Sequence, residues 1–327
     1  MRQPSEDRIQ EIVDEILQDI KVTVPGRLLV AFSGGEDSSL VAFLSKKALG
    51  KDRVTLVTVN WGPFTYSTAK SGVIEVAKNL DLDLIFVDGC LRQSQVWRHG
   101  PSCNLCTRFA KLQSVLDVDP LSYVATGSNL SDSWGQNGIK INGRVYSPLI
   151  KLDKRTIRLL LEHLGIQPMK IGESSVREGC KLKHLLKMMT NPSYHGRAVS
   201  SANEILLSFL REIGYNSVLA NVKIVGPLSK NIALVNVLPN LNDSQSNEII
   251  RRLKDIEVIE EIHVLKSPIK LKILANPGLF NDPMARLRVF EGFIEKDFAV
   301  PISAEWYKSS NHRLRTFQVV GFEYDNP

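Results

Sequence analysis

The 327-residue sequence has few cysteines, few aromatic residues and no long apolar run. Four cysteines are too few for the disulfide framework of a small secreted protein. No apolar stretch approaches the roughly 18 residues that a membrane-spanning helix needs. The first residues are charged and polar, unlike the apolar centre of a secretory signal peptide. We therefore expect a cytoplasmic protein that has no membrane partner.

The charge balance is mildly basic. Lysine and arginine number 41 against 35 aspartates and glutamates, which gives a formal net charge of +6. An excess of this sign favours a polyanionic partner such as RNA. The chain is long enough for two domains, and its pattern breaks around residues 191–196. We expect a catalytic domain over residues 1–192 and a second domain over 193–327.

The first domain alternates short apolar runs with helical patterns. Strands are expected at residues 28–32, 54–59, 84–87 and 122–126, and helices at 5–21, 67–80, 100–115 and 153–164. Asp153 is the expected N-cap of the last of these helices, and Gly165 follows its end. Alternating strands and helices predict an α/β fold with a doubly wound parallel sheet.

The second domain is predicted to be a smaller α+β domain, compatible with a ferredoxin-like layer. Its last segment mixes aromatic and basic residues, among them Trp306, Tyr307, Lys308, Arg313 and Arg315. Such a segment can stack on and neutralise single-stranded RNA, but it can also be an edge strand with a charged outer face. The domain is therefore expected to bind substrate or RNA, or to form a homodimer.

A glycine turn follows the first apolar run. The run ends at Ser33, turns through Gly34 and Gly35, and continues as a helical pattern from Leu40. The free N–H groups and positive dipole end of such a helix suit a phosphate. Asp37 can hold a Mg²⁺ ion that bridges phosphates. The expected phosphate-binding residues are Ser33, Gly34, Gly35, Ser38 and Ser39; an ordinary turn capped by serines is the structural alternative.

The string Ser33-Gly34-Gly35-Glu36-Asp37-Ser38 resembles the PP-loop of the N-type ATP pyrophosphatase superfamily. That resemblance implies an adenine nucleotide alpha hydrolase-like fold and ATP that is cleaved between its α- and β-phosphates. It also implies that Asn60, which follows the second strand, and the Gly127, Asn129 and Asp132 set line the nucleotide pocket. Without the resemblance, the residues from Gly127 to Asp132 would be interpreted as a loop with an aspartate cap.

The cysteines suggest a site. Cys103 and Cys106 are separated by two residues, and Cys180 follows 74 residues later (180 minus 106). Three thiolates can hold a [4Fe–4S] cluster and leave one iron open. Cys90 is either a packed thiol or the fourth ligand of a zinc site. Persulfide chemistry without a metal is a third interpretation. A helix is expected directly after Cys180, with Lys181, Lys183 and Lys187 either near the site or on a solvated face.

The PP-loop and the cysteines together resemble the iron–sulfur-dependent tRNA thiolases, over about residues 25–190. The resemblance implies that Cys103, Cys106 and Cys180 hold the cluster and take part in catalysis with Asp37. It also implies an ATP-dependent sulfurtransferase with Mg²⁺, a sulfur donor that is sulfide or a carrier protein, and a tRNA acceptor. Thr107 and the lack of terminal zinc-finger cysteines depart from that pattern.

Three other functions remain open at this point. The acceptor of sulfur can be a small molecule or a cofactor precursor. A PP-loop ligase that forms amides would need no cluster, and its cysteines would hold structural Zn²⁺. A nucleotide-binding protein that interacts with RNA is the alternative outside enzymology.

Overall fold

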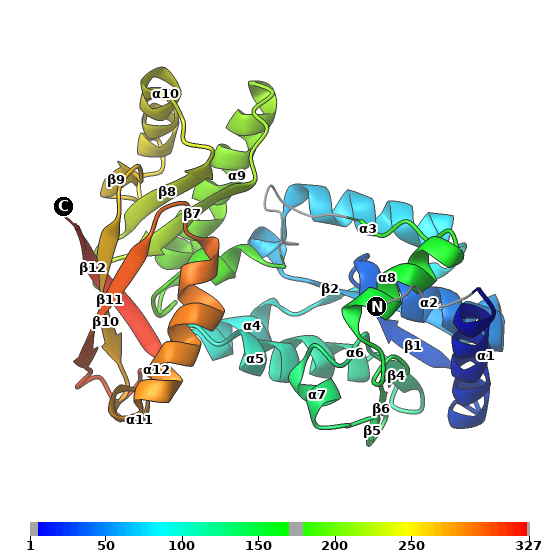
Figure 1. Ribbon diagram of the computed structural model, residues 1–327. Helices are drawn as coiled ribbons and strands as arrows, with labels where there is room; N and C mark the ends of the chain where they lie inside the picture. Colours follow the sequence, from blue (N-terminus) through cyan, green and yellow to red (C-terminus); the bar gives the residue numbers. More distant parts are fainter. Residues whose placement is uncertain (1–5, 170–178, 326–327) are drawn as a thin grey trace. The chain divides into compact units, whose positions relative to one another are not determined.

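The computed structural model describes residues 6–169 and 179–325. Their elements form two compact units, each containing its own sheets (Figure 1). The first unit takes its described residues from Met1–Asn60, Thr68–Gly89 and Arg108–Lys170. The second takes them from Trp61–Ser67, Cys90–Thr107 and Ile171–Pro327. Among the described residues, no helix has the length and apolar character needed to cross a membrane.

The first unit contains a six-stranded sheet in the order β3-β2-β1-β4-β6-β5. Neighbouring strands are parallel except for β5 and β6, which form an antiparallel pair at one edge. The strands are β1 (Leu28–Ala31), β2 (Val54–Asn60), β3 (Asp83–Asp88), β4 (Tyr123–Ala125), β5 (Ile141–Asn142) and β6 (Val145–Tyr146). This topology confirms the predicted α/β fold with a Rossmann-like, adenine nucleotide alpha hydrolase-type sheet.

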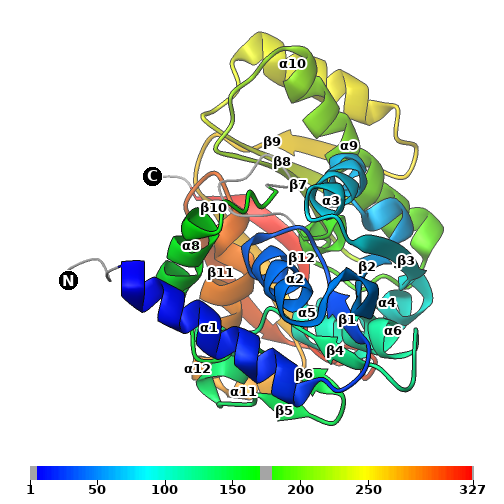
Figure 2. The same ribbon diagram turned by 90° about the vertical axis from the view of Figure 1, so that its right-hand side faces the viewer.

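Long helices pack on this sheet through apolar stripes. One continuous core joins Val13 and Ile16 of a first helix, Leu40 of a second, Ile157 of a third and Val30 of β1. The helices that contribute to it are α1 (Glu6–Thr23), α2 (Glu36–Leu49), α3 (Ser67–Asn79) and α8 (Lys154–His163). Helices α1, α2 and α8 lie side by side in both views (Figures 1 and 2). Asp153 caps α8 by accepting the Thr156 N–H at 2.8 Å, as predicted.

The parallel strands direct several loops to one edge of this sheet. The glycine turn, Gly89 and Gly127 come after the carboxyl ends of β1, β3 and β4, and Asn60 is the last residue of β2. Ligands of open α/β sheets bind at this edge. The Gly89 N–H donates to the Asn60 carbonyl at 3.1 Å, which joins the ends of β2 and β3 directly.

The second unit contains two three-stranded sheets, and it is an α+β unit as the sequence predicted. One sheet has the order β7-β8-β9 and the other β11-β10-β12. Its strands are β7 (Leu219–Val225), β8 (Ile232–Leu238), β9 (Glu261–Val264), β10 (Ile269–Ala275), β11 (Ile302–Lys308) and β12 (Phe317–Tyr324). Its longer helices are α4 (Cys90–Trp97), α9 (Arg197–Glu212), α10 (Asp243–Lys254) and α12 (Pro283–Val289).

The prediction of a helix directly after Cys180 is wrong. The structure has only a 3-10 turn there, Lys181–His184, and the segment that follows runs through the interior. Leu182, Leu185 and Leu186 are all fully buried, so the segment has no polar face to present to solvent. Lys181 is buried too, and its ammonium donates to the Pro63 carbonyl and pairs with Glu204 at 2.6 Å. The prediction failed because an amphipathic pattern was assumed for a segment that is buried all round.

Lys187 fastens this buried segment to the turn between β7 and β8. Its side chain is 0% exposed, and its ammonium donates to the Pro227 and Lys230 carbonyls at 2.6 and 2.8 Å and to Asn231 Oδ1 at 3.2 Å. Burial lowers the pKa of Lys187 to about 7, although Glu260 acts in the opposite direction. The interior thus holds a cation that folding makes easier to deprotonate.

Replacing Lys187 with methionine should therefore flatten the dependence of stability on pH. Between about pH 7 and the ordinary lysine value of 10.5, the unfolded chain binds more protons than the folded one. The free energy of unfolding of the parent should rise with pH there, by at most about 1.4 kcal/mol per pH unit. Urea denaturation of parent and Lys187→Met at several pH values in this window measures the slope. Lys230→Met removes a partly exposed lysine of the same turn and should keep the slope of the parent. Equal slopes in the parent and in Lys187→Met would contradict the lowered pKa of Lys187.

Candidate functional site

The glycine turn between β1 and α2 leaves the start of the helix open. Gly34 has a φ of 71°, a conformation that favours glycine. Gly35 is the N-cap of α2, so the N-cap residue itself offers no side chain to the first N–H groups of the helix. An uncapped helix start at the edge of a parallel sheet suits an anionic group such as a phosphate.

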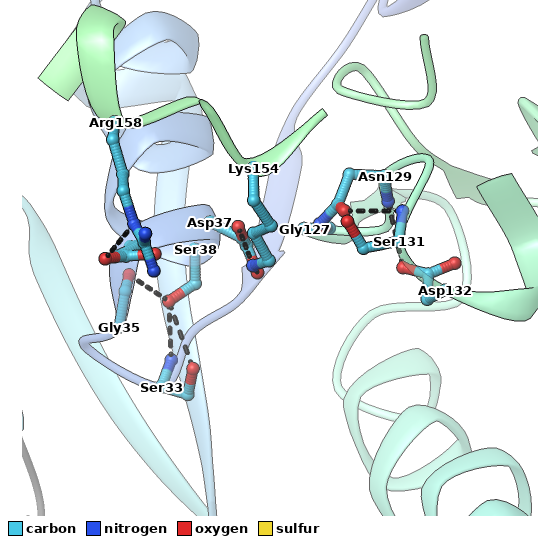
Figure 3. A network of polar contacts seen from close by, with 11 residues as sticks. Ser33, Gly35, Asp37, Ser38, Gly127, Asn129, Ser131, Asp132, Lys154 and Arg158 are labelled. Carbon is cyan, nitrogen blue, oxygen red and sulfur yellow. Dashed lines mark hydrogen bonds and ion pairs between the residues drawn. The ribbon is translucent and has the colours of Figure 1, made fainter. Parts of the chain in front are cut away.

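The serines of the turn have two different roles. Ser38 Oγ lies 3.2 Å from the Ser33 N–H, 3.1 Å from Ser33 Oγ and 3.2 Å from the Gly35 carbonyl, so it organises the turn from inside (Figure 3). Ser39 is fully buried, and its hydroxyl has no hydrogen-bond partner among the described residues. A buried hydroxyl without a partner at the start of the helix is compatible with a phosphate-binding turn. The predicted contacts of these serines with phosphate stay a prediction.

Two ion pairs join the start of α2 to the start of α8. Lys154 donates to both carboxylate oxygens of Asp37, at 2.6 and 2.5 Å, and Arg158 donates to Glu36 at 3.1 Å (Figure 3). The basic pair is one helical turn apart on α8, and the acidic pair is adjacent in the chain. The site therefore holds cations close to the open helix start, where ATP phosphates and Mg²⁺ are expected.

Sequence reasoning missed Lys154 and Arg158. A signal was present, because Lys154 and Arg155 begin a helix that has no acidic residue in its first turn. Cations are unfavourable near the positive end of a helix dipole, so their presence there indicates a partner outside the helix. The partner itself was not predictable, because Asp37 lies 117 positions earlier in the chain.

Gly127 lies directly against Asp37. A Cβ built on Gly127 would lie 2.6 Å from Asp37 Cβ and 3.3 Å from the Ser38 nitrogen. The structure thus brings together two of the predicted site segments, the glycine turn and the loop after β4. No larger residue fits at position 127 without displacing the turn.

The rest of the loop after β4 is held by its own polar groups. Asp132 accepts the N–H groups of Asn129, Trp134 and Gly135 through its two carboxylate oxygens, at 2.9 to 3.0 Å. Asn129 is buried, donates to the Gly127 carbonyl and accepts the Ser131 N–H, both at 3.0 Å (Figure 3). Asn129 and Asp132 therefore shape the loop. Their predicted contact with nucleotide stays a prediction, as does that of Asn60.

Residues 8–90 match the family model described as NAD synthase. This stretch is therefore similar to a PP-loop domain. The match includes the glycine turn from Ser33 to Ser39 and the strands β1 to β3, and it agrees with the parallel sheet and the open helix start. A PP-loop domain indicates an ATP-dependent enzyme that produces AMP and pyrophosphate. Mg²⁺ is the usual companion of ATP phosphates, and Asp37 is a carboxylate already engaged with a cation.

The cysteines at positions 103, 106 and 180 lie in the second unit. Burial raises the pKa of Cys103 and of Cys180, and nearby Cys106 raises both further. Cys103 keeps an exposed surface, whereas Cys106 is buried. Cys103, Cys106 and Cys180 come from distant parts of the sequence, yet their thiols interact with one another electrostatically. We call Cys103, Cys106 and Cys180 the thiol cluster.

Polar residues surround the thiol cluster. Lys183 and Lys223 each pair with Asp297 at 3.4 Å, and both lower the pKa of Cys103. The Gln93 amide Nε2 donates to Cys180 Sγ at 3.3 Å. Cys90 starts α4, three residues before Gln93, and a Cβ on Gly62 would lie 3.0 Å from its sulfur. No disulfide joins any of the four cysteines, all of which are among the described residues.

The fit of the thiol cluster to a metal is partial. Three thiols are a suitable donor set for an iron–sulfur cluster or zinc. However, no group of three or more His, Cys, Asp or Glu residues in the described ranges is arranged to hold a metal ion. We therefore derive no chemical step through a metal at this place.

Gly127→Ala should weaken ATP binding without unfolding the protein. The added methyl group would push Asp37 and the start of α2 out of position. A displacement of about 1 Å in an active site can lower the reaction rate about 100-fold. We expect at least a tenfold loss of ATP affinity by isothermal titration calorimetry, in a protein that stays folded but melts at a lower temperature than the parent.

Gly26→Ala is the matched control, because Gly26 has open space around its Cα and no positive φ. It should bind ATP like the parent. Parent-like affinity in Gly127→Ala would remove the loop after β4 from the nucleotide site.

Proposed function

We propose that the protein is an ATP-dependent sulfurtransferase, which adenylates a carbonyl oxygen of its acceptor and replaces that oxygen with sulfur. One observation carries the proposal: a chain with a PP-loop domain also gathers three cysteines, separated by up to 77 positions (180 minus 103), into one thiol cluster. The first feature supports activation by ATP, and the second supports the handling of sulfur.

In the activation step, the acceptor oxygen attacks the α-phosphorus of ATP and pyrophosphate leaves. The uncapped start of α2 would bind phosphate oxygens through its N–H groups. Asp37 would hold Mg²⁺, and Lys154, which now occupies Asp37, would then be available to the negative charge of the leaving pyrophosphate. This exchange of partners keeps every charge at the site paired.

In the second step, sulfur forms a bond to the activated carbon and AMP leaves with the original oxygen. With hydrosulfide as nucleophile, one proton is released and no electron is gained or lost. The donor of that sulfur is free sulfide or a carrier protein. The thiol cluster is the part of the chain that supports its delivery.

The finer form of the proposal assigns a [4Fe–4S] cluster to Cys103, Cys106 and Cys180. When bound by three thiolates, such a cluster supplies an open iron that can carry hydrosulfide. In this proposal Cys90 is a packed thiol and not a ligand, which is compatible with its position close to Gly62.

The proposed acceptor is a tRNA base. The net charge of +6 supports a polyanionic partner. Lys308, Arg313 and Arg315 are exposed, and none of them pairs with a carboxylate of the described chain. The His99 carbonyl accepts the Arg315 N–H at 2.9 Å, which fixes the backbone that presents these cations. A small molecule or cofactor precursor is the alternative acceptor.

An assay with bulk tRNA, ATP, Mg²⁺ and sulfide tests the function. We expect pyrophosphate and AMP in equal amounts and thionucleosides in the digested tRNA. Asp37→Ala should lower pyrophosphate release at least about 100-fold, because it removes the carboxylate that holds Mg²⁺. If AMP forms with ammonia and not with sulfide, the protein is an amide-forming ligase and the proposal is wrong.

The iron content of four variants tests the cluster. After anaerobic reconstitution, Cys103→Ser, Cys106→Ser and Cys180→Ser should each lose iron and the broad absorption at about 400 nm. Cys90→Ser is the matched control and should keep both. Loss of iron in Cys90→Ser would indicate a four-thiolate site, and a colourless parent that holds zinc would exclude the cluster.

A further inference from the structure

Strand β3 is an open edge of the sheet in the first unit. Among the described residues it pairs only with β2, in a parallel register without a bulge along its whole length, Asp83–Asp88. The centre of the strand, residues 84–87, contains neither a charge nor a proline. Ile85 and Phe86 are 36% and 37% exposed. Natural edge strands are usually kept from pairing by charges, prolines, bulges or short length, and the centre of β3 has none of these.

The other sheet edges in the described structure are short, charged or covered. β5, at the far side of the same sheet, has two residues, and β9 has four. β11 carries Glu305 and Lys308, and β7 is buried along its whole length. β12 is joined through Val319 to Leu186 and Gly226. Of these edges, β3 combines length, exposure and an uncharged apolar centre.

The backbone groups that β3 presents outward can be identified. The Gly89 N–H donates to the Asn60 carbonyl of β2 at 3.1 Å. The backbone groups of alternate residues in a strand point to the same side, so those of Ile85, four residues before Gly89, also face β2. The N–H and carbonyl groups of Leu84 and Phe86 therefore point away from the sheet. No described strand lies on that side to receive them.

We propose that β3 is a homodimer interface, in which it pairs antiparallel with β3 of a second copy of this chain about a two-fold axis at Ile85. Leu84 of each copy then lies opposite Phe86 of the other, and the two residues exchange both of their outward backbone hydrogen bonds. Ile85 lies opposite Ile85 of the other copy. This inference does not depend on the proposed function, and each copy keeps its own nucleotide site.

The sequence of β3 favours a second copy as the occupant. A two-fold interface has to be complementary to itself, and Asp-Leu-Ile-Phe-Val-Asp has the same pattern of charge and apolar residues in either direction. An antiparallel copy therefore places apolar residues against apolar residues at the centre of the pair. Such cross-strand pairs are the unit by which a sheet is stabilised.

The two aspartates of β3 and its backbone exclude the same neighbouring register. Asp83 and Asp88 are both exposed, and like charges directly opposite each other destabilise a strand pair. In the proposed register Asp83 lies opposite Val87 of the other copy and Asp88 lies opposite Leu82. A shift by one residue would place Asp83 opposite Asp88 at both ends. The same shift would set outward backbone groups of one copy against groups that face β2 in the other.

The mass of the full-length protein in solution tests the interface. Sedimentation velocity at micromolar concentration should give the parent twice the mass of one chain. Ile85→Lys places two ammonium groups opposite each other at the axis, so it should raise the dissociation constant of the dimer at least about tenfold. Leu121→Lys is the matched control, because Leu121 is a 90% exposed apolar residue of the same unit in the loop before β4; it should stay dimeric. A monomeric parent, or an unweakened dimer in Ile85→Lys, would overturn the inference.

Phe86→Pro tests the backbone pairing separately from the side chain at the axis. It removes an N–H that points outward and leaves the hydrogen bonds of β3 with β2 in place, as proline can do on an edge strand. We expect a folded monomer, with the fold checked by circular dichroism. A folded Phe86→Pro that dimerises like the parent would show that β3 does not pair between copies.

A cysteine at the axis tests the register. Opposite residues of a pair without hydrogen bonds have Cα atoms about 4.5 Å apart, which a disulfide can bridge. Mild oxidation should therefore convert Ile85→Cys to a covalent dimer that dithiothreitol separates. Phe86→Cys should form much less, because Leu84 of the other copy lies opposite it, and the parent with its four cysteines gives the background. Background levels in Ile85→Cys, or more covalent dimer in Phe86→Cys than in Ile85→Cys, would contradict the proposed pairing.

Discussion

The start of helix α2 is the constraint on which the nucleotide site depends. Gly34 needs a positive φ, Gly35 caps the helix without a side chain, and Gly127 leaves no room beyond its own hydrogen. Each glycine brings main chain close to the place expected for phosphate. The ion pair between Asp37 and Lys154 places a cation beside the turn. Backbone geometry thus comes first, and the charges of the site are arranged around it.

The sequence was sufficient for the sheet and the turn because both are local patterns. Short apolar runs predicted β1 to β4 within a few residues, and Asp153 predicted the start of α8. The glycine turn could be located from a six-residue string. These features depend on neighbours in the chain, which a sequence displays directly.

Features that depend on distant partners could not be predicted in the same way. Lys154 finds Asp37 across 117 positions, and Lys187 is buried because carbonyls of a turn 40 positions later accept its hydrogens. A lysine in the sequence gives no sign that backbone oxygens will surround it. Gln93 was overlooked for the same reason, since only the fold brings its amide to Cys180. The cysteines were easier, because their spacing and a family resemblance pointed to them.

The chain passes several times between the two units, and this limits how the protein can be divided for expression. The second unit includes Trp61–Ser67 and Cys90–Thr107, which are excursions from a sheet that belongs to the first unit. Trp61–Ser67 alone supplies Tyr66 and Ser67, which hydrogen-bond His184 and Glu204 of the second unit. Neither unit can therefore be separated by a single cut, and a gene fragment encoding one would lack pieces of its interior. Two modules joined end to end would not have this interleaving, so the two units need to be expressed as one chain.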